Sequence, residues 1–159
     1  MNVLFVCPRN CAISVMAGSI LKSVSGGRFT AFSAGDAPDA AVIEQVTDFL
    51  ADHHMPADRV DIKSIADFRA AEAPKIDFVI SVCPAKTTEE LLGLPGDPFV
   101  AHWNIETADD MDARRSEELI RDSFWALVRR IRIFSSLPQG KLASRRQLEQ
   151  RARALEYSP

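Results

Sequence analysis

Long apolar runs are missing from this 159-residue sequence, and no stretch approaches the roughly 20 residues that cross a bilayer. The first seven residues are apolar, but no basic segment leads them and no small-residue cleavage site follows, so we expect no secretory signal. Cysteine is scarce, with three residues, one of them in the first apolar run. An odd count disfavours a secreted disulfide framework and favours reduced thiols, hence a cytoplasmic protein with no membrane partner.

Internal repeats and low-complexity tracts are also absent, and the composition is that of an ordinary globular domain, with 47% hydrophobic and 26% charged residues. The two neighbouring histidines, His53 and His54, have no metal-ligand spacing around them, so we expect neither a metal nor a cofactor. Trp125 lies in an apolar helical stripe and is expected in the core.

The net charge of −3 is unevenly distributed. From Arg129 onward the chain has eight basic and two acidic residues, whereas the preceding part has eleven basic and twenty acidic ones. Two interpretations remain open for the basic end: a solvated helix beside an acidic body, or a surface that binds an acidic partner. Few aromatic residues are interleaved with these arginines, which disfavours a surface for single-stranded nucleic acid.

Short apolar runs alternate with segments whose apolar residues have helical spacing. The runs predict strands at residues 1–7, 29–32, 78–83 and 99–103. The spacing predicts helices at residues 14–26, 40–54, 62–73 (capped at Ser64), 112–136 and 141–157, with a helical turn at 88–92. This alternation predicts a mostly parallel four-stranded sheet with helices on both faces, a three-layer α/β fold.

The ends of the predicted strands point to one functional site. Cys7, Ser33, Cys83 and Trp103 each fall at a predicted strand end. In open α/β sheets the ligand binds beyond the carboxyl ends of the strands, so these four residues are expected to surround one crevice.

The segment from Cys7 to Ser14 joins a strand to the start of a helix, where backbone N–H groups and the helix dipole favour an anion. The same field favours the thiolate of Cys7, which could attack a bound phosphate or arsenate. Asn10 could fix the loop by bonding to its backbone, and the Ser14 hydroxyl could stabilise the sulfur. The alternative is that Cys7 is a buried structural cysteine. The predicted anion-binding residues are Pro8, Arg9, Asn10, Cys11, Ala12, Ile13 and Ser14.

Several motifs, in order along the chain, resemble those of low-molecular-weight protein tyrosine phosphatases and thioredoxin-family-coupled arsenate reductases. They are Val3-Leu4-Phe5-Val6-Cys7 with Asn10, Ser14 and Met16-Ala17; Phe32-Ser33-Ala34-Gly35 with Pro38; Phe78-Val79-Ile80-Ser81-Val82-Cys83; and His102-Trp103-Asn104-Ile105. The resemblance covers residues 2–138, is closer to the arsenate reductases, and implies their fold for residues 1–138. Residues 139–159 form a basic C-terminal extension that is expected to be helical.

The resemblance implies roles for specific residues. Cys7 would be the nucleophile on a phosphate-, arsenate- or sulfate-like oxyanion, and Cys83 would occupy the place of the first resolving cysteine. A thioredoxin-, glutaredoxin- or thiol-type reductant would then restore the thiols. Cys11, inside the loop, is an alternative redox partner for Cys7, or a small loop filler. Arg9 could partly supply charge over the anion or lie at the rim of the pocket.

Three departures from the family pattern bear on activity. The loop arginine, which would hold the oxyanion bidentately, is replaced by Ile13. The general acid falls on Thr107 in an ungapped alignment, and Glu106, Asp109 or Asp110 could replace it only in a rearranged loop. The neighbourhood of the second resolving cysteine contains Leu91.

Two functions therefore remain open. The favoured one is a protein with weak or no catalysis that acts by binding or regulation. The alternative is an active thiol-dependent arsenate reductase or phosphatase that uses Cys7 with Cys83 or Cys11.

Overall fold

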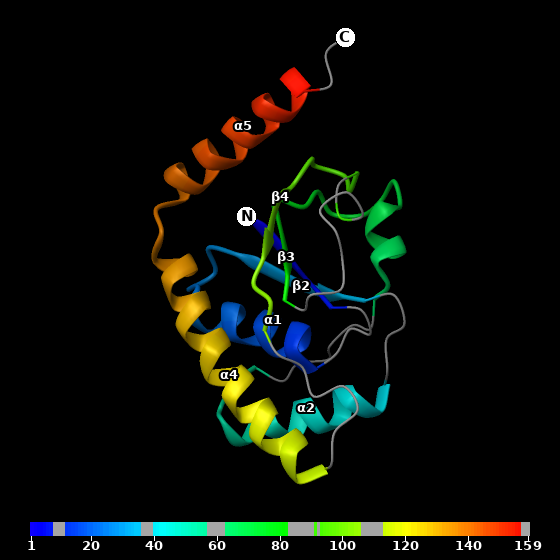
Figure 1. Cartoon of the computed structure of the whole chain (residues 1–159), viewed down its shortest axis with the longest axis vertical. Helices are drawn as coiled ribbons and strands as arrows, with labels where there is room; N and C mark the ends of the chain where they lie inside the picture. Colours follow the sequence, from blue (N-terminus) through cyan, green and yellow to red (C-terminus); the bar gives the residue numbers. More distant parts are fainter. Residues whose placement is uncertain are drawn as a thin grey trace.

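The computed structural model describes residues 1–7, 12–35, 40–56, 63–82, 91, 93–105 and 113–156. Side chains are described for these residues except at 12, 40–43, 45, 113–117 and 149–156. Figure 1 shows the chain from its N-terminal strand to the helix at its C-terminal end.

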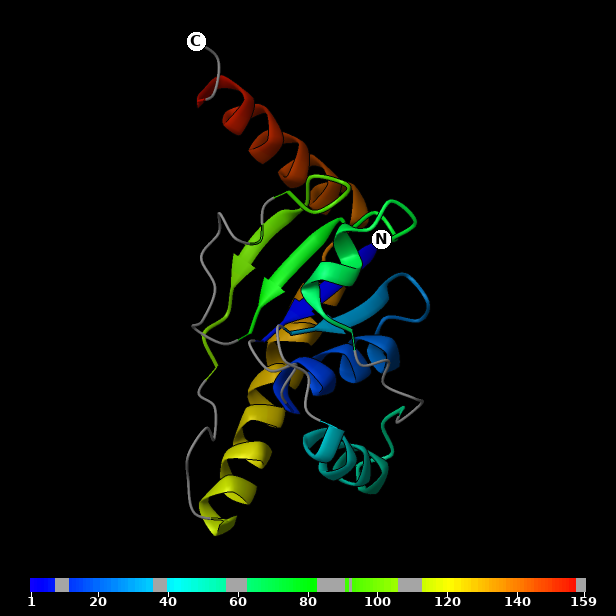
Figure 2. The same ribbon diagram turned by 90° about the vertical axis from the view of Figure 1, so that its right-hand side faces the viewer.

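The sheet has four strands, all parallel, in the order β2-β1-β3-β4. Their bounds are β1 Asn2–Val6, β2 Thr30–Ala34, β3 Phe78–Ser81 and β4 Phe99–His102. All four lie where short apolar runs predicted strands, and the predicted parallel α/β fold is confirmed. Figure 2 shows the strands running in one direction, so that their carboxyl ends share one edge of the sheet.

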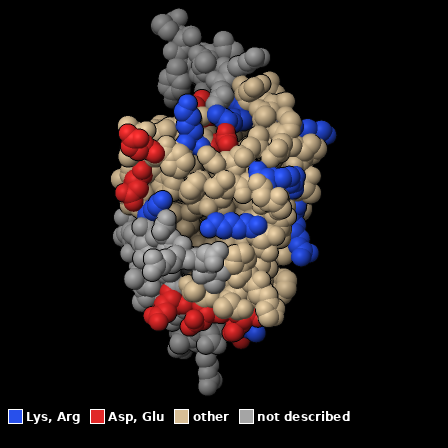
Figure 3. All heavy atoms as spheres, turned by 180° about the vertical axis from the view of Figure 1, so that it is seen from behind, with Lys and Arg blue, Asp and Glu red and all other residues tan. Residues whose placement is uncertain are grey.

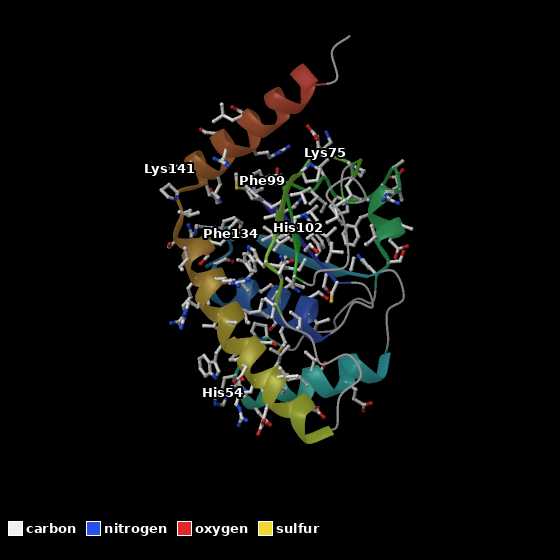
Figure 4. The ribbon with its side chains drawn as sticks, in the orientation of Figure 1. His54, Lys75, Phe99, His102, Phe134 and Lys141 are labelled. Atoms are coloured by element: carbon white, nitrogen blue, oxygen red, sulfur yellow. The ribbon has the colours of Figure 1, made fainter. Side chains whose placement is uncertain are left out.

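Three helices lie on one side of this sheet, α1 Ala12–Val24, α2 Ala40–Asp52 and α4 Ala113–Ser136, and α2 packs against the other two helices. Together with the side chains of alternate strand residues, such as Val3 and Phe5, they enclose the larger of two core clusters. Figure 4 shows Phe134 on the side of α4 that faces the sheet, and its ring lies 5.5 Å from that of Phe78 in β3. We call this cluster the α1-side core.

The opposite face is covered by a short 3₁₀ helix, η1 Ile65–Arg69, and by the segment around Leu91 and Leu94. The Ser64 N–H donates to the Asp67 carboxylate at 2.7 Å, which confirms the predicted start of this element. The prediction of a helix over residues 62–73 was too long, because Ala70 takes an extended backbone and ends the element. The turn predicted at 88–92 lies almost entirely outside the described residues.

The basic C-terminal segment is helical, as predicted: α5 spans Gln139–Glu156. Leu142 is buried within the α1-side core. Arg146 forms an ion pair with Asp77 and donates to the Gly96 carbonyl at 2.8 Å. Figures 1 and 2 show α5 beside the edge at which the strands begin, opposite the predicted site.

None of the described helices is both long enough and apolar enough to cross a bilayer.

Candidate functional site

The carboxyl end of β1 is fixed between its two neighbouring strands. The Cys7 N–H donates to the carbonyl of Ala34, the last residue of β2, at 3.2 Å. On the other side the Val82 N–H donates to the Val6 carbonyl at 3.0 Å. Cys7 therefore lies at the centre of the sheet edge where α/β folds bind ligands, as its place after an apolar run predicted.

The chain that leaves β4 is tied to β3 in the same way. The Trp103 N–H donates to the Ser81 carbonyl at 2.8 Å, and the Ile105 N–H donates to the Val82 carbonyl at 2.7 Å. Asn104, between them, has a φ of +46°, which turns the chain at this point. These bonds bring the ends of β3 and β4 to the same edge as Cys7.

Cys7 itself is 2% exposed, belongs to the α1-side core and is disulfide-bonded. The reduced thiol expected from the sequence is therefore absent at this position. The other two cysteines, Cys11 and Cys83, lie outside the described residues. A disulfide at a site thiol is more typical of a redox or regulatory role than of a structural framework in a reducing compartment.

The first turn of α1 contains the last two residues of the predicted loop, Ile13 and Ser14. Ile13 is 4% exposed, and its side chain belongs to the same core as Cys7. Ser14 is fully buried and has a bonded partner. A buried serine side chain thus lies in the first turn of the helix that follows Cys7, whereas residue 13 contributes an apolar side chain to the core.

Much of the predicted loop is outside the described residues, namely Pro8, Arg9, Asn10 and Cys11. Ala12 begins α1, but its side chain is not described. The predicted acid position Thr107 and the acidic residues Glu106, Asp109 and Asp110 also lie outside. Leu91, in the neighbourhood where the resemblance led us to expect a second resolving cysteine, is fully buried in the core on the η1 side.

Ser33 and Trp103, which were expected to line the crevice, lie elsewhere in the sheet and the core. Ser33 lies inside β2, paired with Phe5 of β1, one residue before the strand ends. The Trp103 ring packs 5.9 Å from the Phe5 ring and 6.5 Å from that of Phe134, between β1 and α4. Trp103 therefore fixes the end of β4 through the core.

Arg130 was missed by the sequence analysis. Its guanidinium donates to the Trp103 carbonyl, which ties α4 to the turn after β4. The sequence contains no signal that could have found Arg130, because its spacing does not distinguish it from the neighbouring solvated arginines of the same helix. Within the described part of the chain, no group of three or more His, Cys, Asp or Glu residues could hold a metal ion.

This fold, a four-stranded parallel sheet with a cysteine between the first strand and the first helix, is that of arsenate reductases and low-molecular-weight phosphatase-like enzymes. A thioredoxin-dependent arsenate reductase from Corynebacterium glutamicum matches at 23% identity and a TM-score of 0.61, over 93% of this chain and 62% of that one. An arsenate reductase from Archaeoglobus fulgidus matches at 24% identity and 0.61, over 85% and 99%. The YwlE arginine phosphatase, solved with a phosphorylated active-site serine, matches at 14% identity and 0.63, over 85% and 93%.

These likenesses establish the fold that the sequence motifs predicted. This chain matches less than two thirds of the Corynebacterium protein's length. No protein-family model matches the sequence, and no curated protein does.

Proposed function

We propose that this chain is an arsenate reductase- or low-molecular-weight phosphatase-like protein with weak or no catalytic turnover, which acts by binding or regulation. One observation carries the proposal: Ile13, at the position of the family arginine, is buried in the α1-side core together with Cys7. An apolar side chain in the core supplies no hydrogen bond to an oxyanion.

The expected decrease in the reaction rate follows from the loss of the hydrogen bonds between the arginine and the oxyanion. An arginine binds two oxygens of the anion through parallel charged hydrogen bonds. Removing even one preorganised donor from a transition state typically slows a reaction by about 10²- to 10³-fold. The absence of an acid at Thr107 would slow the protonation of a leaving group further.

Two features support a remaining oxyanion pocket. The Cys7 backbone is held at the strand edge, and α1 begins within five residues of it, so the helix amino terminus faces this edge. The neighbouring structure of the YwlE arginine phosphatase, a C7S mutant with a phosphorylated active-site serine, supports a phosphoryl-sized anion in this fold. We propose phosphate, arsenate or sulfate as the bound anion.

Calorimetric titration of the pre-reduced protein with phosphate tests this pocket. We expect a single site that Arg9→Ala weakens by roughly 3- to 10-fold, because a rim charge concentrates anions. Lys22→Ala is the matched control, since Lys22 is exposed at the opposite end of α1 and should leave the affinity unchanged. Absence of phosphate binding, or equal weakening by both variants, would contradict an oxyanion pocket at the loop.

The disulfide at Cys7 favours a second candidate function, an active thiol-dependent enzyme. The Cys7 thiolate would add to arsenate with loss of water. A second thiol, Cys83 or Cys11, would then attack the Cys7 sulfur and expel arsenite, so that arsenic gains two electrons while two thiols become a disulfide. An external dithiol, such as the thioredoxin on which the Corynebacterium neighbour depends, would reduce that disulfide.

The acidic partner predicted for the basic C-terminal segment stays a proposal. Arg146 is already engaged with Asp77, so that partner would bind the other basic residues of α5.

A further inference from the structure

Large apolar side chains are exposed on α4. Trp125 is 57% exposed and Ile133 is 61% exposed, although the same helix buries Phe124 and Ile131 in the α1-side core. The sequence analysis placed Trp125 in the core, and this was wrong. Its neighbour Phe124 takes the inward position, where its ring packs 5.4 Å from that of Phe49 in α2.

Two arginines share the outer side of α4 with these apolar side chains. Arg129 lies four residues after Trp125 and four before Ile133, and Arg132 lies seven residues after Trp125; both arginines are exposed. Residues three, four and seven apart share one side of a helix, so these four side chains form one surface. We call it the α4 face.

The arginines of the α4 face have no counter-charge on their own helix. No carboxylate lies three or four residues from Arg129 or Arg132, the spacings at which a helix pairs opposite charges. Arg121, earlier on the same helix, differs because Glu118 lies three residues before it. In the part of the chain that the structure describes, the side chains of Arg129 and Arg132 make no ion pair, whereas Arg130 donates to the Trp103 carbonyl.

We propose that the α4 face binds a short acidic segment of a partner protein, whose carboxylates pair with Arg129 and Arg132 and whose apolar side chains cover Trp125 and Ile133. Arginine suits such a partner because its planar guanidinium binds a carboxylate through two parallel hydrogen bonds. Tryptophan and arginine are also the residues that most often dominate the binding energy of protein interfaces. The face extends about 12 Å along α4, so about two turns of a partner helix would cover it.

The charges around the face favour a short segment over a nucleic acid or an anionic membrane. Exposed carboxylates lie on α2 and on the first half of α4: Glu44, Asp48, Asp52, Glu118 and Asp122. Figure 3 shows acidic side chains at this end of the molecule and basic ones along the edge toward α5. A long polyanion or a lipid surface on α4 would also meet these carboxylates, and like charges across an interface are unfavourable. Phosphates would in addition leave Trp125 and Ile133 uncovered.

A second copy of this chain fits the face less well than an acidic partner. If two α4 helices packed antiparallel about Trp125, Arg129 of one copy would lie opposite Arg121 of the other. Both side chains are positively charged and exposed, so this contact is unfavourable. A separate acidic segment places carboxylates there instead.

The α4 face lies on the opposite side of α4 from the core that contains Cys7. Binding at this face is therefore independent of the proposed oxyanion pocket. Phosphate titration reports on the pocket and peptide binding reports on the face, so either can fail without the other.

Selection from a displayed library of random peptides tests this face, with the full chain immobilised in reducing buffer. Peptides of about 12 residues are long enough for the two helical turns that the face requires. We expect the selected peptides to be enriched in Asp and Glu together with large apolar residues, because the face offers both kinds of contact. Fluorescence anisotropy of a selected peptide then measures its affinity for the chain.

Two variants of the face should weaken binding of the selected peptide. Trp125→Ala should weaken it at least about 30-fold, the effect of losing an interface hot spot. Arg129→Glu/Arg132→Glu should weaken it at least about 10-fold, because carboxylates would then face carboxylates. All three residues are exposed, so these variants should keep the urea midpoint of the wild type.

Lys22→Glu/Lys75→Glu is the matched control, because it makes the same change of net charge at two exposed lysines of α1 and of the segment before β3. It should leave the affinity unchanged. Selected peptides without acidic residues, no enrichment at all, or equal weakening by the control would overturn the proposal. So would binding to phosphatidylglycerol vesicles or duplex DNA that is lost in Arg129→Glu/Arg132→Glu, since the face would then serve a membrane or a nucleic acid.

Discussion

Ile13 is the residue on which the proposed loss of catalysis depends. An arginine at this position would have to leave the core and reach the anion, whereas Ile13 is 4% exposed and packs in the α1-side core. The change from arginine to isoleucine therefore removes a ligand and also adds apolar contacts at the start of α1. The stability that Ile13 adds to the fold can therefore be measured separately from its effect on oxyanion binding.

The substitution Ile13→Arg should destabilise the protein. A guanidinium in this apolar site lacks its hydration, so we expect the free energy of unfolding to fall by about 3 kcal/mol or more. Ile13→Leu is the control, and as a volume-conserving change it should cost less than about 1.5 kcal/mol. Urea unfolding measures both, and equal midpoints together with a gain of arsenate turnover in Ile13→Arg would show that this side chain faces the pocket.

One prediction about a single residue was wrong, because Trp125 was expected in the core and is exposed. Trp125 and Phe124 are neighbours with similar hydrophobicity, and helical spacing allowed either to face the sheet. The rotation of α4 is set by which side chains fit against α1, α2 and the sheet, which is tertiary information. The buried Phe124 and the exposed Trp125 are consequences of that fit.

At the scale of the element, α5 is held by the buried Leu142 and, further along the helix, by Arg146. Arg146 reaches both Asp77, which precedes β3, and the carbonyl of Gly96. Gly96 has a φ of +107°, and a Cβ there would lie 2.6 Å from the Ile76 carbonyl oxygen, so this turn requires glycine. The sequence analysis left open whether the basic segment is a solvated helix beside an acidic body or a surface for an acidic partner, and one of its basic residues binds the helix to the start of the sheet.

Arg146→Ala should loosen α5 without loosening the sheet. The pair is partly exposed, so we expect a loss of about 1 kcal/mol, or roughly fivefold faster hydrogen exchange confined to α5 amides. Gln147→Ala, an exposed neighbour on the same helix, should leave exchange unchanged. Equal exchange in the two variants, or faster exchange in β1 and β3, would contradict this account of how α5 is held.

The strands were predicted correctly because local features of the sequence mark them. The parallel strands are short apolar runs with polar or glycine-rich ends, and these features are visible in sequence. The overlong helix predicted at 62–73 failed because helical spacing persists beyond Ala70, where the backbone is extended.

For the whole molecule, the order of motifs was enough to predict the fold and the place of Cys7. Parallel strands place their carboxyl ends at one edge, so Cys7 and the chain after β3 and β4 had to meet there. The sequence offered Cys83 and Cys11 as partners for Cys7 but could not decide between them, because the pairing depends on which cysteine the fold brings near it. The division into residues 1–138 and 139–159 stays a prediction.

Turnover of the pre-reduced protein measures the central claim most directly. Arsenate would be supplied with thioredoxin, thioredoxin reductase and NADPH, and Cys7→Ser would serve as the blank. We predict that wild type exceeds this blank by no more than a trace, because an oxyanion above Cys7 lacks its arginine. Turnover in the ordinary enzyme range of about 1 s⁻¹ or more, abolished in Cys7→Ser, would contradict the account and establish the thiol-dependent enzyme instead.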